Sequence, residues 1–362
     1  MDVEASVDLG RFEAAVKVVD VHVAGEPCRV AVGGFPEPAG STMIEKRRWM
    51  ERHADDLRRA LMLEPRGHHD MFGAFLCRPV DPRADVGVLF MDTGGYLNMC
   101  GHGAIAVVTA VLEAGIVEAR AGGNEVVLEA PVGLIRATAA VRGGAVESVS
   151  FENVPSFVYR DDVAVQVEGR TVPLTIAFGG SFFALADADG LGLGDIGPET
   201  APAYARLGML VRDEVNRTVA VSHPTLDIDT VDLVEFSASK APKATDAPAA
   251  LRHVVVFGAG QVDRSPCGTG LSAKLAALHR AGKVAVGEPV VCENVIGTRF
   301  TGTIDRTTQV GGHAAVIPRH LPRRSERPAG PRLPVGALTC SRRLPVRTGC
   351  PARRGAGRAC TP

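Results

Sequence analysis

The chain has 362 residues, 46% of them hydrophobic and 22% charged, a balance typical of a soluble globular protein with room for two domains. One Trp and three Tyr offer few surfaces for stacking bases, and there is no run of 18 apolar residues, so we expect neither nucleic-acid binding nor a membrane span. Four acidic residues precede the first apolar run, unlike a secretory signal, so the eight Cys are expected to be free thiols in a reducing, cytoplasmic compartment.

Several runs of the chain predict strands, with a few helices between them. Residues 16–36 indicate two short strands around a Gly-Glu-Pro turn. The stretch from Thr42 to Glu45 matches a helix capping box, and apolar residues at helical spacing continue until Glu64-Pro65 ends the helix. Further β-branched runs, bounded by Gly, Pro or Asp, predict strands within 87–92, 125–141, 172–188, 229–236 and 252–258. The whole pattern predicts a β-rich α+β protein.

Two predicted helices are apolar or small on every face, and their sequences are related. They are CGHGAIAVVTAVLEAGIV, which starts at Cys100, and CGTGLSAKLAALHRAGKV, which starts at Cys267. Aligned without gaps, they share the Cys, two Gly, three Ala at four-residue spacing, the closing Gly and the final Val. Such a repeat predicts two pseudo-symmetric domains, each wrapping a β-sheet around one central buried helix.

The position of each Cys at a helix start has a chemical consequence. Free N–H groups and the positive end of the helix dipole stabilise a thiolate, so we expect the pKa of both thiols to be lowered. The glycines of C-G-H-G and C-G-T-G let a carboxylate approach the backbone N–H groups directly. Two such helix starts facing each other would hold one carboxylate, stabilise a carbanion at its α-carbon and place a thiol on each face of that carbon.

Other interpretations of these cysteines are open at this point. Either Cys alone is as compatible with simple packing as with chemistry, because Cys is among the most buried residue types. A disulfide between Cys100 and Cys267 suits a reducing compartment poorly. A zinc site on Cys100 and His102 lacks a cluster that would supply further ligands, so no metal is expected.

The motifs around the two cysteines, MDTGGYLNMCGHG and DRSPCGTG, resemble the two signatures of the proline racemase family, and similarity extends from about Val16 to Pro318. The resemblance implies a diaminopimelate epimerase-like fold with the site between two domains, no cofactor, a small-molecule substrate and a homodimer. We expect the following division: a flexible N-terminus over 1–15, a first domain over 16–155 carrying Cys100, a second domain over 156–312 carrying Cys267, a return to the first domain over 313–318, and a tail over 319–362.

The resemblance also implies roles for individual residues. Cys100 and Cys267 would be the two bases that act on opposite faces of the α-carbon. Asp263 and His102 would hold the ring amine of the substrate. The substrate carboxylate would accept backbone N–H groups at both helix starts, namely those of Gly101, His102, Gly268 and Thr269.

Members of the family differ in substrate. Trans-3-hydroxyproline dehydratases carry Thr at the second Cys position, so Cys267 favours racemisation or epimerisation over dehydration. Phe72 and Phe257 match positions that pack against the plain ring in proline racemases, whereas a hydroxyproline 2-epimerase must offer a polar group to the ring hydroxyl. The sequence therefore predicts interconversion of L- and D-proline, with 4-hydroxyproline 2-epimerisation as the alternative.

The segment from Arg319 to Pro362 departs from the family pattern. It contains eleven Arg and one Glu, which leaves the rest of the chain with a net charge of about −11. Its Arg, Pro, Gly and Ala texture predicts disorder and resembles GC-rich coding read in a shifted frame, in place of a strand that completes the first domain. The same tail in close relatives would count against a frameshift. A third interpretation is therefore an inactive or unstable family member whose basic tail binds acidic partners.

Overall fold

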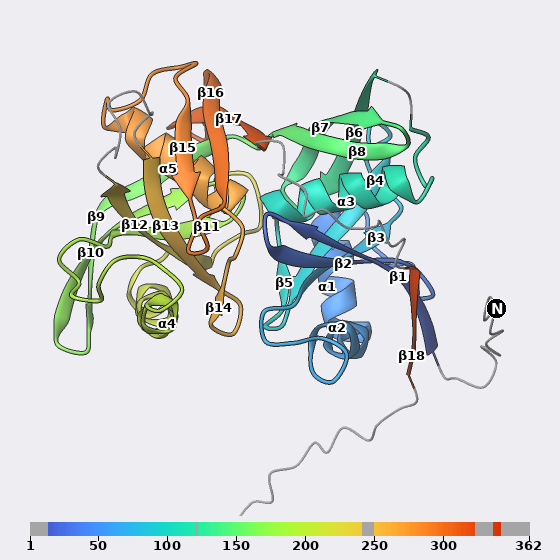
Figure 1. Ribbon diagram of the computed structural model, residues 1–362. Coiled ribbons are helices and arrows are strands. Elements are labelled where there is room, and N and C mark those ends of the chain that lie inside the picture. The colour runs from blue at the N-terminus through green and yellow to red at the C-terminus, as the bar shows by residue number, and fades with distance from the viewer. Residues whose placement is uncertain (1–13, 120–121, 241–249, 323–335, 342–362) are drawn as a thin grey trace, which may run out of the picture.

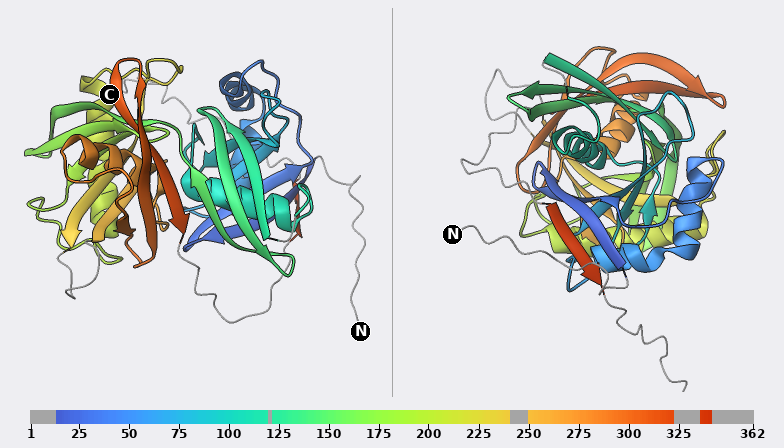
Figure 2. Two further views of the ribbon diagram at one scale, coloured as in Figure 1. Left: turned by 90° about the horizontal axis from the view of Figure 1, so that it is seen from above. Right: turned by 90° about the vertical axis from the view of Figure 1, so that its right-hand side faces the viewer.

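The chain folds into two α+β domains that lie side by side, each built around one helix (Figure 1). The computed structural model describes residues 14–119, 122–240, 250–322 and 336–341. The predicted flexibility of the first residues and the predicted disorder of 323–335 and 342–362 lie outside these ranges. Two further views show the strands of each domain curving around its central helix (Figure 2).

The elements alternate between strands and helices in both halves of the chain. The first half forms β1 Ala14–Val23, β2 Glu26–Gly33, α1 Met43–His53, α2 Asp55–Met62, β3 Phe72–Cys77, β4 Val86–Asp92, β5 Tyr96–Leu97, α3 Gly101–Glu113, β6 Gly122–Ala130, β7 Gly133–Arg142 and β8 Ala145–Glu152. The second half forms β9 Ser156–Val167, β10 Arg170–Phe178, β11 Phe182–Asp187, α4 Ala201–Thr218, β12 Val231–Lys240, β13 Ala250–Phe257, β14 Gln261–Val262, α5 Gly268–Arg280, β15 Val290–Glu293, β16 Arg299–Val310, β17 His313–Pro322 and β18 Gly336–Ser341. All of the strand-rich runs predicted from the sequence are confirmed.

Strand pairing follows the same order in both domains. In the first domain β1–β2 pair antiparallel, β2–β3 parallel, β3–β4 antiparallel, β4–β6 parallel, and β6, β7 and β8 antiparallel. In the second domain β10, β11, β12, β13, β15, β16 and β17 repeat this series of directions. The short hairpins β4–β5 and β13–β14 correspond as well. The predicted pseudo-symmetric α+β architecture is therefore confirmed.

The two related sequences form the central helices α3 and α5, each 13 residues long. Most of their side chains are small or apolar and are buried inside the curved sheet, which removes a large apolar surface from water. Each helix is followed by a glycine in the left-handed region, Gly115 with φ 69° and Gly282 with φ 68°. Glycine adopts this backbone conformation without steric cost, so the repeated Gly ends both helices at the same point.

The chain crosses between the domains twice. After β8 it enters β9, which begins at Ser156 and pairs with β10 of the second domain. β18 pairs antiparallel with β1 of the first domain, from Ala14↔Ser341 to Val19↔Gly336. β9 therefore lies beside β10, the first strand of the second series, just as β18 lies beside β1, the first strand of the first series.

Two predictions about the end of the chain differ from the structure. Residues 313–318 do not return to the first domain, because β17 pairs with β16 along its length and meets β8 at Arg319 and His320. The predicted disorder of the tail is wrong for 319–322 and 336–341, since β17 continues to Pro322 and 336–341 form β18. Strand pairing uses backbone N–H and C=O groups, so the edge of β1 accepts an extended segment even where its side chains predict no strand.

The helical region after β2 is broken once. Thr42 caps α1 as predicted, with its Oγ1 accepting the N–H of Glu45 at 3.2 Å. The single predicted helix is divided at Ala54, whose φ of −144° interrupts the helical conformation between α1 and α2. In the described part of the chain, the helices are too short or too polar to cross a bilayer.

Candidate active site

The N-terminal ends of α3 and α5 meet where the two domains abut (Figure 1). A Cβ added to Gly101 would lie 2.8 Å from the Cα of Gly268, and one added to Gly268 would lie 3.1 Å from the Cα of Gly101. The ring of Phe151 packs against both positions, with its Cζ 3.1 Å from each added Cβ. Two backbones approach this closely only where neither carries a side chain, which gives the repeated C-G motif a steric reason.

Cys100 and Cys267 cap the two helices in the same way. Each sulfur accepts the N–H of the residue three positions ahead, Gly103 or Gly270, at 3.4 Å. Both residues are buried, with 7% and 4% of their surface exposed. The backbones differ, because Cys267 has a φ of 37°, in a region that costs energy for a residue with a Cβ, whereas Cys100 is extended.

The pKa of both thiols is raised, which contradicts the expectation from the sequence. Burial raises the pKa of Cys100 and Cys267 well above 9.0, the charge of Asp263 adds to this, and the capping N–H groups oppose it. A helix terminus contributes about 0.3–1 kcal/mol, whereas full burial shifts a pKa by up to about 3–5 units, so burial prevails. The enclosed site therefore favours the thiol over the thiolate.

The side chain of His102 lies beside Cys100. Its Nδ1 is 3.1 Å from the Cys100 sulfur, and its ring packs edge-on against Phe72 with ring centroids 4.4 Å apart. Burial lowers the pKa of His102, so the ring is neutral at pH 7. In the described part of the chain its Nε2 has no hydrogen-bond partner, which leaves one ring nitrogen facing the site.

Asp263 supplies negative charge to the site. It lies between β14 and α5, is buried, and its Oδ1 accepts the backbone N–H of Ser265 at 2.7 Å. Its charge raises the pKa of Cys100 and of Cys267, and it opposes the effect of burial on the pKa of His102. One carboxylate is therefore close enough to act on all three of these groups.

Two aromatic rings and a hydroxyl complete the predicted set. Phe72 on β3 and Phe257 on β13 are both buried, with ring centroids 6.3 Å apart in an edge-to-face arrangement. Thr269 places its Oγ1 3.7 Å from the sulfur of Cys267. The structure thus gathers around the two helix starts every residue named from the sequence, namely Cys100, Gly101, His102, Asp263, Cys267, Gly268, Thr269, Phe72 and Phe257.

Glu26 is part of this site although the sequence analysis did not assign it there. It is fully buried at the start of β2, and its Oε2 accepts the backbone N–H of Arg264 at 2.8 Å, next to Asp263. Burial, with the charge of Asp263 as the next contribution, raises the pKa of Glu26 to about 9. Glu26 is therefore a neutral carboxylic acid at pH 7, and it ties β2 to the loop that carries Asp263. The sequence places Glu26 only in the predicted Gly-Glu-Pro turn, because a contact across 238 positions leaves no local pattern.

Further contacts close the two domains over the site. Gln261 is buried and accepts the hydroxyl of Thr93 at 2.7 Å, and it donates to the carbonyl of Met71 at 3.2 Å. A Cβ added to Gly94 would lie 2.9 Å from the backbone of Gly258. Gln261 has no motif signal either, since a lone Gln on a short hairpin resembles an ordinary surface residue.

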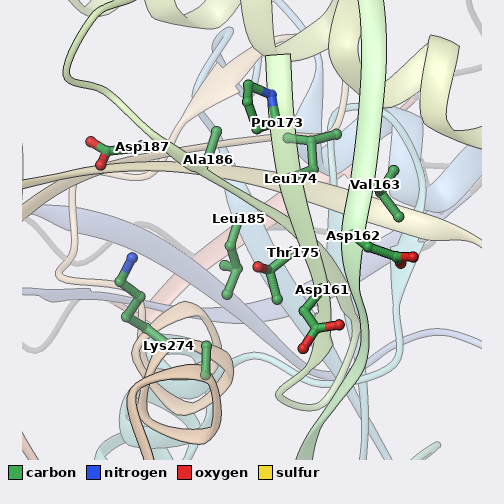
Figure 3. Close-up of a pocket in the computed structure, with 11 residues that line it drawn as sticks. Asp161, Asp162, Val163, Pro173, Leu174, Thr175, Leu185, Ala186, Asp187 and Lys274 are labelled. Atoms are coloured by element: carbon green, nitrogen blue, oxygen red, sulfur yellow. The ribbon is translucent and has the colours of Figure 1, made fainter. Parts of the chain in front are cut away.

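A separate cavity of about 490 Å³ lies in the second domain, between β9, β10, β11 and α5 (Figure 3). Asp161, Asp187 and Lys274 line it, and it contains none of the site residues above. The Lys274 ammonium donates to Ser237 Oγ at 2.6 Å. Across the described ranges, no group of three or more His, Cys, Asp and Glu side chains is arranged to hold a metal ion.

The chain matches known proteins along most of its length. The family described as proline racemase matches residues 18–321. The chain belongs to the proline racemase family. The proline racemase of Clostridioides difficile is 48% identical over 312 residues, which cover 85% of this chain and 91% of that protein.

Two solved structures of the family superpose closely. A probable proline racemase from Agrobacterium radiobacter K84, with bound carbonate, has a TM-score of 0.80 at 38% identity, covering 85% of this chain and 90% of that one. A hydroxyproline epimerase from Agrobacterium vitis, with bound trans-4-hydroxy-L-proline, has a TM-score of 0.81 at 36% identity, covering 86% and 90%. The fold is thus the diaminopimelate epimerase-like fold of this family, and the chain is an isomerase of the amino-acid racemase class.

The neutral state of Glu26 predicts a pH dependence of stability. The unfolded chain releases this proton above 4.5, whereas the folded protein holds it up to about 9, so folding takes up a proton between these values. The contribution of Glu26 therefore becomes less favourable as pH rises through this range, by at most about 1.4 kcal/mol per pH unit. In Glu26→Gln, denaturant unfolding between pH 5 and pH 9 should show a smaller loss of stability than in the wild type. The exposed Glu199→Gln is the control, and equal pH dependence in Glu26→Gln and wild type would contradict a buried neutral Glu26.

Proposed function

We propose that this enzyme interconverts L- and D-proline by removing the α-proton on one face of the carbon and returning a proton on the other. The observation that carries the proposal is the meeting of two buried cysteines, each capping a helix whose first residues contact those of the other helix. Inversion at a carbon needs an acid and a base on opposite sides, and two equivalent thiols from two related domains supply them.

Backbone N–H groups at the two helix starts would bind the substrate carboxylate. The α-proton of an amino acid is weakly acidic because its carboxylate resists further negative charge. The N–H groups of Gly101, His102, Gly268 and Thr269 belong to the first turns of the two helices, where a backbone N–H has no acceptor within its own helix. They are fixed by the helices and lie in a water-poor site, where hydrogen bonds to a developing charge are strong. Because these two helix starts converge, both sets of donors can act on one carboxylate.

The ring amine would lie between Asp263 and His102. Asp263 is buried and close enough to both thiols and to His102 to shift their pKa values, so a cationic amine would neutralise a charge that is otherwise costly to bury. A neutral His102 can donate from Nδ1 to the Cys100 sulfur and accept an N–H at Nε2, which has no hydrogen-bond partner among the described residues. These contacts orient the amine without any cofactor.

The raised thiol pKa values suit the proposed proton transfer. A base must be strong to remove a proton from so weak a carbon acid, and a thiolate whose conjugate acid has a raised pKa is a stronger base than an exposed one. One thiolate and one thiol are required at the start of each turnover, and their roles are exchanged at its end.

The aromatic wall favours proline over a hydroxylated ring. Phe72 and Phe257 offer carbon surfaces and no hydrogen-bond partner, so a ring hydroxyl facing them would lose its hydrogen bonds to water. Cys267 also supplies the second proton donor that dehydration would not need. Activity on 4-hydroxyproline alone remains the alternative outcome of the test below.

We further propose that the enzyme works as a homodimer in the cytoplasm, as family resemblance implies. A reducing compartment would keep the five described thiols, all buried and free, in the reduced state that proton transfer requires. Light scattering of the purified protein would give twice the chain mass if the dimer forms, and the single-chain mass would reject it.

The central test is α-hydrogen exchange in deuterated water. With L-proline the wild-type enzyme should incorporate α-deuterium while optical rotation is lost, and 4-hydroxyproline should react much more slowly. Cys100→Ser and Cys267→Ser should each lower racemisation by at least about 100-fold, because an acid or base in the transition state contributes about 10²–10⁴-fold. Cys77→Ser, a buried Cys outside the site, is the matched control. Normal racemisation in either site variant rejects the two-base mechanism, and turnover of hydroxyproline alone selects the epimerase.

The contact between the two helix starts predicts a steric effect. In Gly101→Ala the added Cβ would push against the backbone of Gly268 and against Phe151, which would separate the thiols. A displacement of about 1 Å costs about 100-fold in rate, so kcat/KM for proline should fall by that order. Gly33→Ala, where a Cβ meets nothing within 4 Å, is the control and should retain activity. A fully active Gly101→Ala would mean that close contact of the helices is not needed.

A further inference from the structure

The two helix starts match in their caps but differ in the groups beside each sulfur. On the first helix, the Nδ1 of His102 lies 3.1 Å from the sulfur of Cys100. On the second helix, Thr269 lies at the matching position, with its hydroxyl 3.7 Å from the sulfur of Cys267. The surroundings of Cys267 also contain a buried carboxylate, that of Glu235, to which no role has been assigned above.

Glu235 lies beneath the first turn of α5. It comes from β12, and only 1% of its surface is exposed. A Cβ added to Gly270 would lie 2.5 Å from Glu235 Oε2 and 3.1 Å from the sulfur of Cys267. Carboxylate and sulfur therefore flank the same small space, which exists because residue 270 is glycine.

His253 lies beside the other oxygen of this carboxyl group. Its Nδ1 is 3.4 Å from Glu235 Oε1, and both side chains are buried between adjacent strands, where Ser237 pairs with His253. Burial alone would lower the pKa of His253, but Cys292 and Glu235 outweigh it, and the pKa is raised well above 6.5. The two side chains thus lie within ion-pair distance, although neither makes a hydrogen bond among the described residues. Oε1 lies on the His253 side, and Oε2 lies beside the helix start.

A carboxylate oxygen beside a thiol in a water-poor site disfavours ionisation of that thiol. Glu235 raises the pKa of Cys267 by more than the capping N–H of Gly270 lowers it. At Cys100, Cys28 and Glu26 also raise the pKa, but each by less than the capping N–H of Gly103 lowers it. At Cys100 the neighbouring imidazole can instead donate an N–H to a thiolate. The sulfurs of Cys100 and Cys267 are capped in the same way, but the charged groups around them differ.

We propose that Glu235, with His253 beside it, is a positioning residue that keeps the proton on Cys267, so that Cys100 is the thiol that ionises more readily. The proposal rests on the two-thiol mechanism above and adds an order to it. In the resting enzyme, Cys100 is the base and Cys267 the acid, and the enzyme must exchange protons to regain this state after a turnover that reverses them. The two related halves of the chain therefore differ in which cysteine keeps its proton.

Alkylation of the substrate-free enzyme tests this assignment, because iodoacetamide reacts with thiolates. The full-length protein is treated with limiting iodoacetamide at pH 8.5, and peptide mapping by mass spectrometry separates Cys100 and Cys267 from the other six Cys. In the wild type, Cys100 should be modified at least about tenfold more than Cys267, since one unit of pKa difference changes the thiolate fraction tenfold. Glu235→Gln should move this ratio toward equality or reverse it.

Glu293→Gln is the matched control, and its ratio should equal that of the wild type. Glu293 lies on β15 next to Cys292 and forms ion pairs with Arg252 and Arg299. Successive strand residues point to opposite faces, so Glu293 points away from the His253 pair. A wild-type preference for Cys267 overturns the proposal even if Glu235→Gln does not fold, and so does an unchanged ratio in a folded Glu235→Gln. Alkylation does not require catalytic turnover. Its result therefore tests the role of Glu235 independently of whether the enzyme racemises proline.

Discussion

The close contact of two helix starts is the constraint on which the rest of the structure depends. Gly101 and Gly268 bring the ends of α3 and α5 together, and the ring of Phe151 covers both. Two complete domains are needed to reach this point, because each supplies one helix, one cysteine and one set of free N–H groups. The strand order is repeated in the two halves of the sheet, and it brings both helix ends to the same place from the two domains.

Burial at this contact determines the charges of the site. The same closure that aligns the thiols also removes water, so the pKa values of both sulfurs and of Glu26 are raised and that of His102 is lowered. Asp263 is the charged group that several of these shifts share. A zwitterionic amino acid complements such a site, since its amine meets a carboxylate and its carboxylate meets two helix starts.

The sequence predicts the parts of the structure that depend on residues close together in the chain. The C-G repeat predicts both central helices and the pseudo-symmetry, because a helix start and its glycine stop are encoded within eighteen residues. The direction of the thiol pKa shift could not be predicted, since it depends on how completely the two domains enclose the sulfurs. Glu26 and Glu235 were missed for a related reason, because their contacts with Arg264 and with the turn at Gly270 join distant segments. β18 could not be predicted either, because it pairs with β1 through backbone groups and its sequence lacks the side-chain pattern of a strand.

The most direct measurement of the central claim is a crystal structure of the enzyme with a planar five-membered ring carboxylate, which mimics the carbanion. We expect the Cys100 and Cys267 sulfurs on opposite faces of the ring carbon that bears the carboxylate, each about 3–3.5 Å from it. Both sulfurs on one face, or one sulfur directed into a different pocket, would contradict this expectation.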